Sequence, residues 1–179
     1  MDFYVSDIRN TVPQHFNNEI QKSIYDTLKT LGIPFGRVET DDGTTMESCV
    51  AISAGLGCAV VKTIFLCNRQ GTMFYLYVTD ADKTFVTRDF CSALGIPRVS
   101  FASEETLFDH LGTRRGATTL LSLVNDTSHQ VALVLDREVT ERQFIGCTDG
   151  TNRGFVKIAT ADIVERFLPH TGHQPTIIG

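Results

Sequence analysis

No stretch of the 179-residue sequence approaches the ~20 consecutive apolar residues that a helix needs to cross a membrane. The opening residues, MDFYVSD, also lack the basic and then apolar pattern of a secretory signal peptide. We therefore expect a protein that has no membrane partner and works in the cytoplasm.

Metal-ligand, disulfide and nucleotide-binding patterns are missing as well. The five cysteines are odd in number, widely spaced and without a Cys-x-x-Cys pair, and the five histidines show no ligand spacing. Gly55-Leu56-Gly57 precedes a predicted strand instead of linking a strand to a helix, so it does not indicate a phosphate-binding loop. We expect reduced, mostly buried thiols, and we predict neither a metal nor a cofactor.

Basic residues are in the minority, with 16 Lys and Arg against 21 Asp and Glu, which gives a formal net charge of −5. Broad binding to duplex DNA requires a basic surface that displaces counterions, so DNA is not an expected partner and any nucleic-acid contact must be local. The composition, 42% hydrophobic and 21% charged, is that of a globular chain with a real core. The length fits a single domain covering residues 1–179.

Hydrophobic periodicity and turn residues predict an α+β fold. Helices are predicted over residues 16–31, 46–56 and 88–94, from after Ser103 to Gly112, and over 161–168, where Pro169 should stop the last one. Strands are predicted over residues 35–39, 60–67, 72–78, 131–135, 143–147 and 155–158. Because strands and helices do not alternate strictly, we expect a mixed, largely antiparallel sheet with helices packed on it.

One lysine interrupts the apolar strand predicted at residues 60–67. The side chains on both faces of this strand are mainly apolar, so both faces should be covered. Side chains on a strand alternate, so Lys62 shares its face with Val60, Ile64 and Leu66. Burying an unpaired ammonium is costly, so Lys62 should find acceptors or lie at a cavity wall, where it could hold a phosphate, carboxylate or carbonyl group. The alternative is a lysine that extends to the sheet edge and reaches water.

The segment TRRGATT at residues 113–119 is a second candidate. It combines two cations, a glycine that permits close backbone approach, and hydroxyl groups, which together could seat a phosphate at a nucleotide end. The alternative is a solvated loop between a helix and a strand.

A third candidate is the predicted hairpin turn at residues 147–152, CTDGTN. Cys147 could act as a nucleophile only with a base that makes its thiolate, and no histidine lies nearby in the sequence. A purely structural turn is the alternative.

Three segments, in this order, resemble those of the freestanding prolyl-tRNA deacylases, relatives of the editing domain inserted in bacterial prolyl-tRNA synthetase and of the YbaK group. They are VKTIFL at residues 61–66, GATTLLSLVND at 116–126 and FLPHTGHQP at 167–175. The resemblance extends from the helix near Phe16 to Gly179. It implies the fold of that family, a mixed and mostly antiparallel barrel-like sheet surrounded by helices.

The resemblance also implies a chemistry. These proteins hydrolyse the ester that joins an amino acid to the terminal adenosine of a tRNA, typically alanine misplaced on the tRNA for proline. Lys62 matches the active-site lysine, which positions the adenosine and the ester, while a ribose hydroxyl of the substrate helps to activate water. The protein then mainly orients the substrate and excludes larger amino acids. The implied substrate-binding residues are Thr63, Gly116, Ala117, Thr118, Thr119, Thr148 and Asn152.

Two positions depart from the family pattern. Leu120 stands where the loop that begins at Gly116 has a proline, and alignment on Asn152 places Thr148 where the family has a histidine. A threonine hydroxyl makes hydrogen bonds but cannot act as a cation or base near neutral pH. The leading hypothesis is a deacylase that acts in trans on the acceptor end of mischarged tRNA. The alternative is a family member that binds a tRNA end, a nucleotide or a protein without catalysis.

Overall fold

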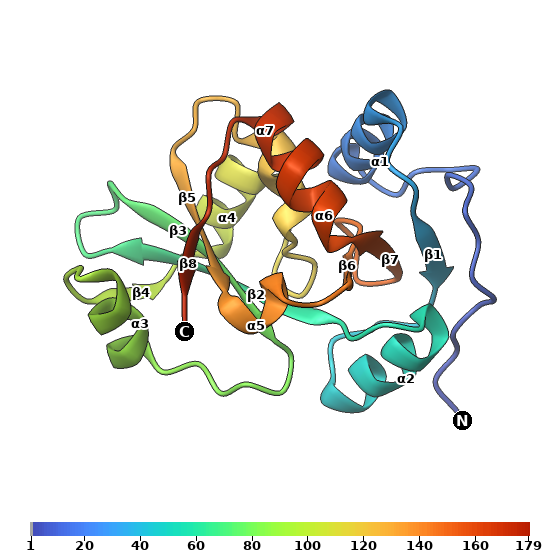
Figure 1. The fold of residues 1–179 in the computed structure, drawn as a ribbon, viewed down its shortest axis with the longest axis horizontal. Helices are drawn as coiled ribbons and strands as arrows, with labels where there is room; N and C mark the ends of the chain where they lie inside the picture. The colour runs from blue at the N-terminus through green and yellow to red at the C-terminus, as the bar shows by residue number, and fades with distance from the viewer. Residues whose placement is uncertain (1) are drawn as a thin grey trace.

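A computed structural model describes residues 2–179 and arranges them in two β-sheets with helices around them (Figure 1). The first sheet consists, in spatial order, of β1 (Gly36–Glu39), β7 (Gly154–Ala159) and β6 (Phe144–Thr148). The second consists, in order, of β4 (Val99–Phe101), β2 (Val61–Asn68), β3 (Phe74–Asp80), β5 (Val131–Asp136) and β8 (Thr176–Ile178).

The prediction of a mixed, mostly antiparallel α+β fold is confirmed. Only the β3–β5 and β5–β8 pairs are parallel, and the other four ladders are antiparallel. The expectation of one sheet was wrong, because the predicted strands divide between two. The short strands β4 and β8 were not predicted, since three residues are too few to show a period.

The two sheets meet at one isolated parallel bridge between Val60 and Gly146. The Gly146 N–H donates to the Ala59 carbonyl at 3.1 Å. A Cβ atom at Gly146 would lie 3.0 Å from that carbonyl oxygen and 3.2 Å from the Cys58 sulfur, so glycine permits this close approach. Beyond the bridge the chains diverge, β2 to its partners β3 and β4 and β6 to its partner β7.

Four longer helices were predicted and are present. They are α1 (Glu19–Leu31), α2 (Met46–Leu56), α3 (Thr87–Leu94) and α4 (Glu104–Leu111). Helix α1 begins three residues later than predicted because Asn18 caps it, its side-chain oxygen accepting from the Gln21 N–H at 2.8 Å. In Figure 1, α1 and α2 lie with β1 toward one end of the molecule, while α3 lies beside β4 at the other.

The segment after residues 113–119 is not a strand. Residues Leu120–Asn125 form a 3₁₀ helix, η1, and the hydroxyl of Thr119 caps it by accepting from the Leu121 N–H at 3.3 Å. A second short helix, α5 (Arg137–Thr140), follows β5. An apolar run does not distinguish a buried strand from a short buried helix, which explains the wrong expectation.

The last helix does not stop at Pro169, as the sequence predicted. It comprises α6 (Thr160–Asp162), a π-helical turn η2 (Ile163–Phe167) and α7 (Leu168–Thr171), and it ends at Gly172. In the wider turn the Leu168 N–H donates to the Ile163 carbonyl. The hydrogen bond there spans five residues where an α-helix spans four. Pro169 consequently falls in the first turn of α7, where a residue without an N–H is tolerated.

The five-stranded sheet is covered on both faces, as the apolar pattern of β2 predicted. Phe65 of β2 belongs to the main core with α1, α4, η1 and the C-terminal helix, whereas Ile64 and Leu66 pack with Phe90 of α3. A third cluster joins Val60 to α2 and β7. None of the helices formed by residues 2–179 is both long and apolar enough to span a membrane.

Candidate functional site

Lys62 is the second residue of β2 and lies opposite Thr79 of β3. Its side chain is half-buried, and the ammonium donates to the main-chain carbonyl of Lys83 in the loop between β3 and α3. It also lines a cavity of about 720 Å³. Lys62 therefore lies at a cavity wall with an acceptor, as the strand pattern suggested, and the cavity is within the usual size of a ligand site, about 300–1,000 Å³.

The strand crossing places a second predicted residue near Lys62. Lys62 lies two residues beyond Val60, and Thr148 lies two residues beyond Gly146, the other member of the bridge between the sheets. Both side chains line the same cavity. The cavity thus lies in the fork where β2 and β6 separate.

Thr148 uses its hydroxyl to tie the hairpin to the neighbouring loop. The hydroxyl donates to the Ala117 carbonyl at 3.1 Å and accepts from the Gly150 N–H at 3.2 Å. A hydroxyl has a single proton, so this bond occupies the donor of Thr148.

Gly116 and Thr118 of that loop also line the cavity. The loop turns through a hydrogen bond from the Ala117 N–H to the Arg114 carbonyl at 3.0 Å. Gly116 has a φ of 89°, and a Cβ atom there would lie 3.1 Å from the Thr44 methyl group. Glycine is therefore needed both for the conformation and for the close approach to the segment before α2.

Five of the eight predicted site residues line this one cavity: Lys62, Thr63, Gly116, Thr118 and Thr148. The other three lie elsewhere. Thr119 is fully buried as the cap of η1, and Ala117 and Asn152 line an adjacent groove. The Asn152 amide donates to the Asp42 carboxylate at 2.7 Å, which joins the hairpin turn to the loop before α2.

Several residues that line the cavity were not predicted. They include Cys49, Phe85 and Phe101, whereas Arg115, which also lines the cavity, belongs to the loop that the sequence singled out for its two cations. Phe85 and Phe101 meet edge to face with ring centroids 5.8 Å apart, and Phe101 is 64% exposed. An exposed phenylalanine cannot be told from a core one by residue type, so the sequence held no signal for this wall.

A buried carboxylate supports the loop that holds Lys62. Asp136 accepts from the Thr79 hydroxyl at 2.9 Å, the Tyr77 hydroxyl at 3.1 Å and the Lys83 ammonium at 2.6 Å. Burial acts to raise the pKa of Asp136, but the hydrogen bonds from Lys83 and Thr79 outweigh it and hold the pKa below its usual value. Asp136 therefore anchors Lys83, whose main-chain carbonyl is the acceptor for Lys62.

The cysteines offer no activated nucleophile. All five are free, with Cys91 and Cys147 buried and the others half-buried. Burial raises the pKa of the Cys147 thiol to about 12, so the thiol remains protonated at neutral pH. Burial also raises the pKa of Cys49 at the cavity wall. Within residues 2–179, no three His, Cys, Asp or Glu side chains group as metal ligands would.

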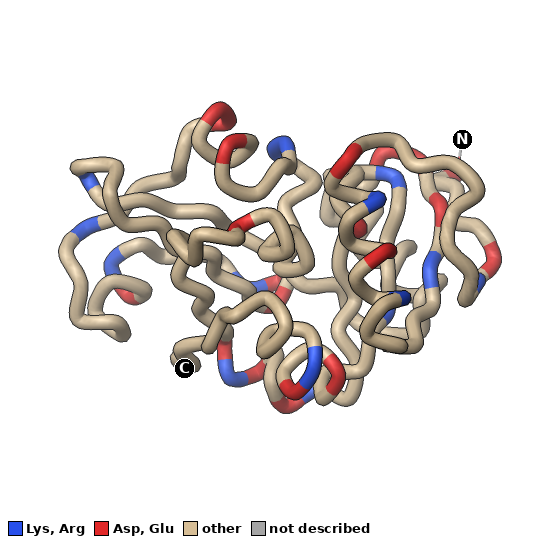
Figure 2. Tube along the Cα trace, turned by 90° about the horizontal axis from the view of Figure 1, so that it is seen from above, with Lys and Arg blue, Asp and Glu red and all other residues tan. Residues whose placement is uncertain are grey.

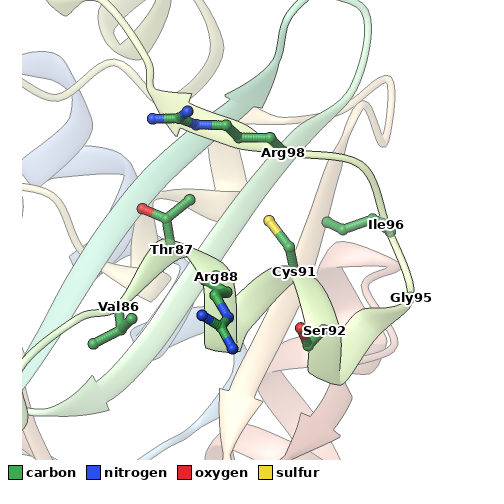
Figure 3. Close-up of a pocket in the computed structure, with 8 residues that line it drawn as sticks. All are labelled: Val86, Thr87, Arg88, Cys91, Ser92, Gly95, Ile96 and Arg98. Carbon is green, nitrogen blue, oxygen red and sulfur yellow. The ribbon is translucent and has the colours of Figure 1, made fainter.

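A separate cavity of about 640 Å³ lies along α3 (Figure 3). It shares no lining residue with the cavity around Lys62. Its two arginines, Arg88 and Arg98, extend in different directions and do not converge on one point (Figure 3). Five of the residues singled out by the sequence line the cavity around Lys62 instead, and the candidate site is placed there.

Comparison with known proteins identifies the family of the chain. The family described as the aminoacyl-tRNA editing domain matches residues 40–165. The prolyl-tRNA synthetase associated domain-containing protein 1 of Danio rerio is 32% identical over 162 residues, covering 89% of this chain and 87% of that protein. The prolyl-tRNA editing protein ProX of Acetoanaerobium sticklandii is 26% identical over 155 residues, covering 87% and 94%.

A solved structure of a candidate trans-editing enzyme for prolyl tRNA synthetase has the same fold, with a TM-score of 0.66 at 16% identity. The alignment covers 91% of this chain and 98% of the other. The match to the family extends over most of the chain, including both strands of the fork and the loop of Gly116. The chain belongs to the aminoacyl-tRNA editing domain family.

Proposed function

We propose that this protein hydrolyses the ester of mischarged tRNA in trans and that alanine on the tRNA for proline is its substrate. The observation that carries the proposal is the cavity in the fork between β2 and β6, which gathers Lys62, Gly116 and Thr148. The relationship to ProX, which is named a prolyl-tRNA editing protein, supports the choice of tRNA.

In the proposed reaction Lys62 orients the substrate. An ammonium has three donors, and the Lys83 carbonyl accepts one of them, so two remain for the terminal adenosine and the ester carbonyl. A ribose hydroxyl of the substrate assists the attacking water, so the protein needs no base of its own. Its contribution is the positioning of the ester and its water.

The proposed selectivity for a small amino acid depends on the walls of the cavity. Phe85, Phe101 and the Gly116 loop lie around Lys62 and limit the space beside the ester. One methylene group changes such discrimination by only about 1–3 kcal/mol, so the activity should fall gradually from alanine to larger residues.

The direct test compares hydrolysis of Ala-tRNA for proline by the wild-type protein and by Lys62→Ala. Loss of one transition-state donor typically costs about 100-fold or more in rate, and that loss is expected here. Lys29→Ala, which changes an exposed lysine of α1, is the matched control and should keep full activity. The proposal fails if no charged tRNA in a panel loses its amino acid faster with the wild type than with Lys62→Ala.

One observation favours a second candidate function. Thr148 replaces the histidine of the family, and its hydroxyl proton is already donated to Ala117. Because this hydroxyl has no proton left to donate to a substrate, the second candidate is a protein that binds the aminoacylated end without hydrolysing it. Tight binding of an uncleavable alanyl-adenosine analogue, without turnover of the matching ester, would distinguish it from the enzyme.

A further inference from the structure

A groove of about 950 Å³ adjoins the cavity around Lys62. Its walls come from the start of α1, from α4, from the loop after α4 and from the hairpin turn between β6 and β7. Arg115 lines both the groove and the cavity, so the two meet at this residue. A ligand whose end lies beside Lys62 can therefore continue past Arg115 into the groove.

The groove gathers three arginines from two segments that are distant in the sequence. Arg114 and Arg115 come from the loop, and Arg153 comes from the hairpin turn. All three are exposed, and none of their guanidinium groups is within ion-pair distance of a carboxylate anywhere in residues 2–179. Two carboxylates, Glu19 and Glu104, also line the groove, so the cations exceed the anions by one.

An aromatic side chain accompanies these cations. Phe108 of α4 is 48% exposed, and the Arg114 guanidinium carbon lies 5.0 Å from the centre of its ring. An exposed ring beside unpaired arginines is the combination on which proteins stack the bases of single-stranded nucleic acid while they hold its phosphates. An acidic peptide would use the arginines but would supply no base to stack on the exposed ring.

We propose that this groove binds the single-stranded nucleotides that precede the terminal adenosine of tRNA. Arg114, Arg115 and Arg153 contact phosphates, and one base stacks on Phe108 beside Arg114. The proposal rests on the proposed function, which places the terminal adenosine and its ester beside Lys62. It adds a binding surface that the reaction at the ester does not itself require.

The overall charge makes such a local contact necessary. The formal net charge is −5, and Figure 2 shows basic and acidic residues interspersed along both halves of the chain trace. The protein therefore has little long-range attraction for a polyanion. A short groove with unpaired arginines is a place where phosphates can still be bound.

The first experiment measures the binding of a fluorescein-labelled RNA hexamer ending in CCA, by anisotropy over a range of salt concentrations. Each phosphate contact with a single strand contributes about 0.7 to the salt slope, so the variant with Arg114→Gln, Arg115→Gln and Arg153→Gln should lose about 2 in slope. Its affinity should fall at least about tenfold. Phe108→Leu should weaken binding about fivefold or more, as expected for loss of a stacked base.

Arg69→Gln is the matched control, because Arg69 is an exposed arginine in the turn between β2 and β3 and lies outside the groove. It should bind the hexamer as the wild type does. Thermal unfolding of each variant checks that the fold is retained. The proposal is overturned if the triple variant binds the hexamer within about twofold of the wild type, or if a hexaglutamate peptide binds as tightly as the RNA.

A second experiment separates this proposal from the proposed function. Alanyl-adenosine carries the ester but lacks the preceding nucleotides. A double variant with Arg114→Gln and Arg153→Gln, whose residues do not line the cavity around Lys62, should therefore hydrolyse it at the wild-type rate while showing a raised KM for Ala-tRNA. Lys62→Ala should show the reverse, with turnover lost while the salt slope of hexamer binding, which reports the phosphate contacts of the arginines, stays that of the wild type. If the wild type turns over Ala-tRNA and the triple variant keeps the wild-type KM, the groove proposal fails while the proposed function stands. If no ester is hydrolysed but hexamer binding depends on the arginines, the proposed function fails while the groove remains a binding site for single-stranded RNA.

Discussion

The hydroxyl of Thr148 connects two segments that form a wall of the cavity around Lys62. In the family pattern this place holds a histidine, whereas here the side chain joins the hairpin turn to the Ala117 carbonyl of the Gly116 loop. The hydroxyl stabilises one wall of the cavity and keeps no proton for a substrate. We therefore propose that Thr148 positions the Gly116 loop and does not take the part of the family's histidine.

Replacing Thr148 by valine should test this role. The change keeps the shape but leaves the Ala117 carbonyl and the Gly150 N–H without their partner, which should lower the free energy of unfolding by about 1 kcal/mol. Displacement of the loop should also slow ester hydrolysis, on the order of tenfold. Urea unfolding and turnover of Ala-tRNA measure the two effects. Thr148→Ser keeps the hydroxyl and should restore both, and a valine variant equal to the wild type would contradict this role.

Gly116 should be the most sensitive position of the loop. Alanine at a positive φ costs about 1–2 kcal/mol, and at Gly116 the added methyl group would also crowd Thr44. Gly71→Ala is a control for the conformational cost alone, because φ there is 68° and no atom lies within 4 Å of the added group. We expect Gly116→Ala to be the less stable variant in denaturant titrations and the only one of the two with lowered activity. Equal stability and activity of the two would show that the contact with Thr44 is unimportant.

The site was predicted in part because some of its residues carry a local signal. A lysine on an apolar strand face and a glycine in a loop with hydroxyls stand out in one sequence. Cys49, Phe85 and Phe101 carry no such signal, since they reach the cavity only through the pairing of distant strands. Thr119 and Asn152 have suitable chemistry, but capping and a bond to Asp42 direct their side chains elsewhere.

At the scale of elements, the loop between β3 and α3 is held by Asp136 at the end of β5. The carboxylate accepts from Lys83, whose carbonyl in turn accepts from Lys62. The position of the site lysine therefore depends on a strand that does not line its cavity. Helices and strands with clear periods were predicted well. The π-helical turn before Pro169 could not be predicted, because a sequence pattern does not show how a backbone respaces its hydrogen bonds.

Asp136→Asn should weaken both stability and activity. The uncharged amide loses the ion pair with Lys83, and when its oxygen accepts from Lys83, Tyr77 and Thr79 its NH₂ group faces the Glu138 N–H. The free energy of unfolding should therefore fall by about 1–3 kcal/mol at pH 7. Turnover should fall with it as the Lys83 carbonyl moves, while Lys83→Met, which keeps the main-chain acceptor, should have a smaller effect.

The pH dependence of stability provides an independent readout for Asp136. Its pKa in the folded protein lies below its ordinary value of 3.8, so its stabilisation is present above that pH and is lost as the pH falls through the folded pKa. Wild-type protein should therefore lose more free energy of unfolding than Asp136→Asn when the pH is lowered below 3.8. Parallel pH profiles of the two proteins in urea titrations would contradict the assignment.

At the scale of the whole molecule, the negative net charge predicts a small electrostatic footprint on tRNA. With three groove arginines as the phosphate contacts, a salt slope of about 2 corresponds to a rise in KM for Ala-tRNA of about 20-fold between about 50 and 200 mM salt. Steady-state kinetics over that range measure it. A much steeper dependence would indicate many more contacts than the groove provides. The assignment of residues 1–179 to one domain stays a prediction.

The fork between β2 and β6 has a consequence for selectivity. Lys62 belongs to one sheet and Thr148 to the other, and a single pair of residues, Val60 and Gly146, joins the strands just before them. A small change in the angle between the sheets therefore alters the width of the cavity without breaking a ladder of hydrogen bonds. In an editing enzyme of the proposed kind, the Val60–Gly146 bridge is the hinge about which the cavity widens or narrows. The largest amino acid admitted is then set partly by packing around Gly146, at a distance from the ester itself.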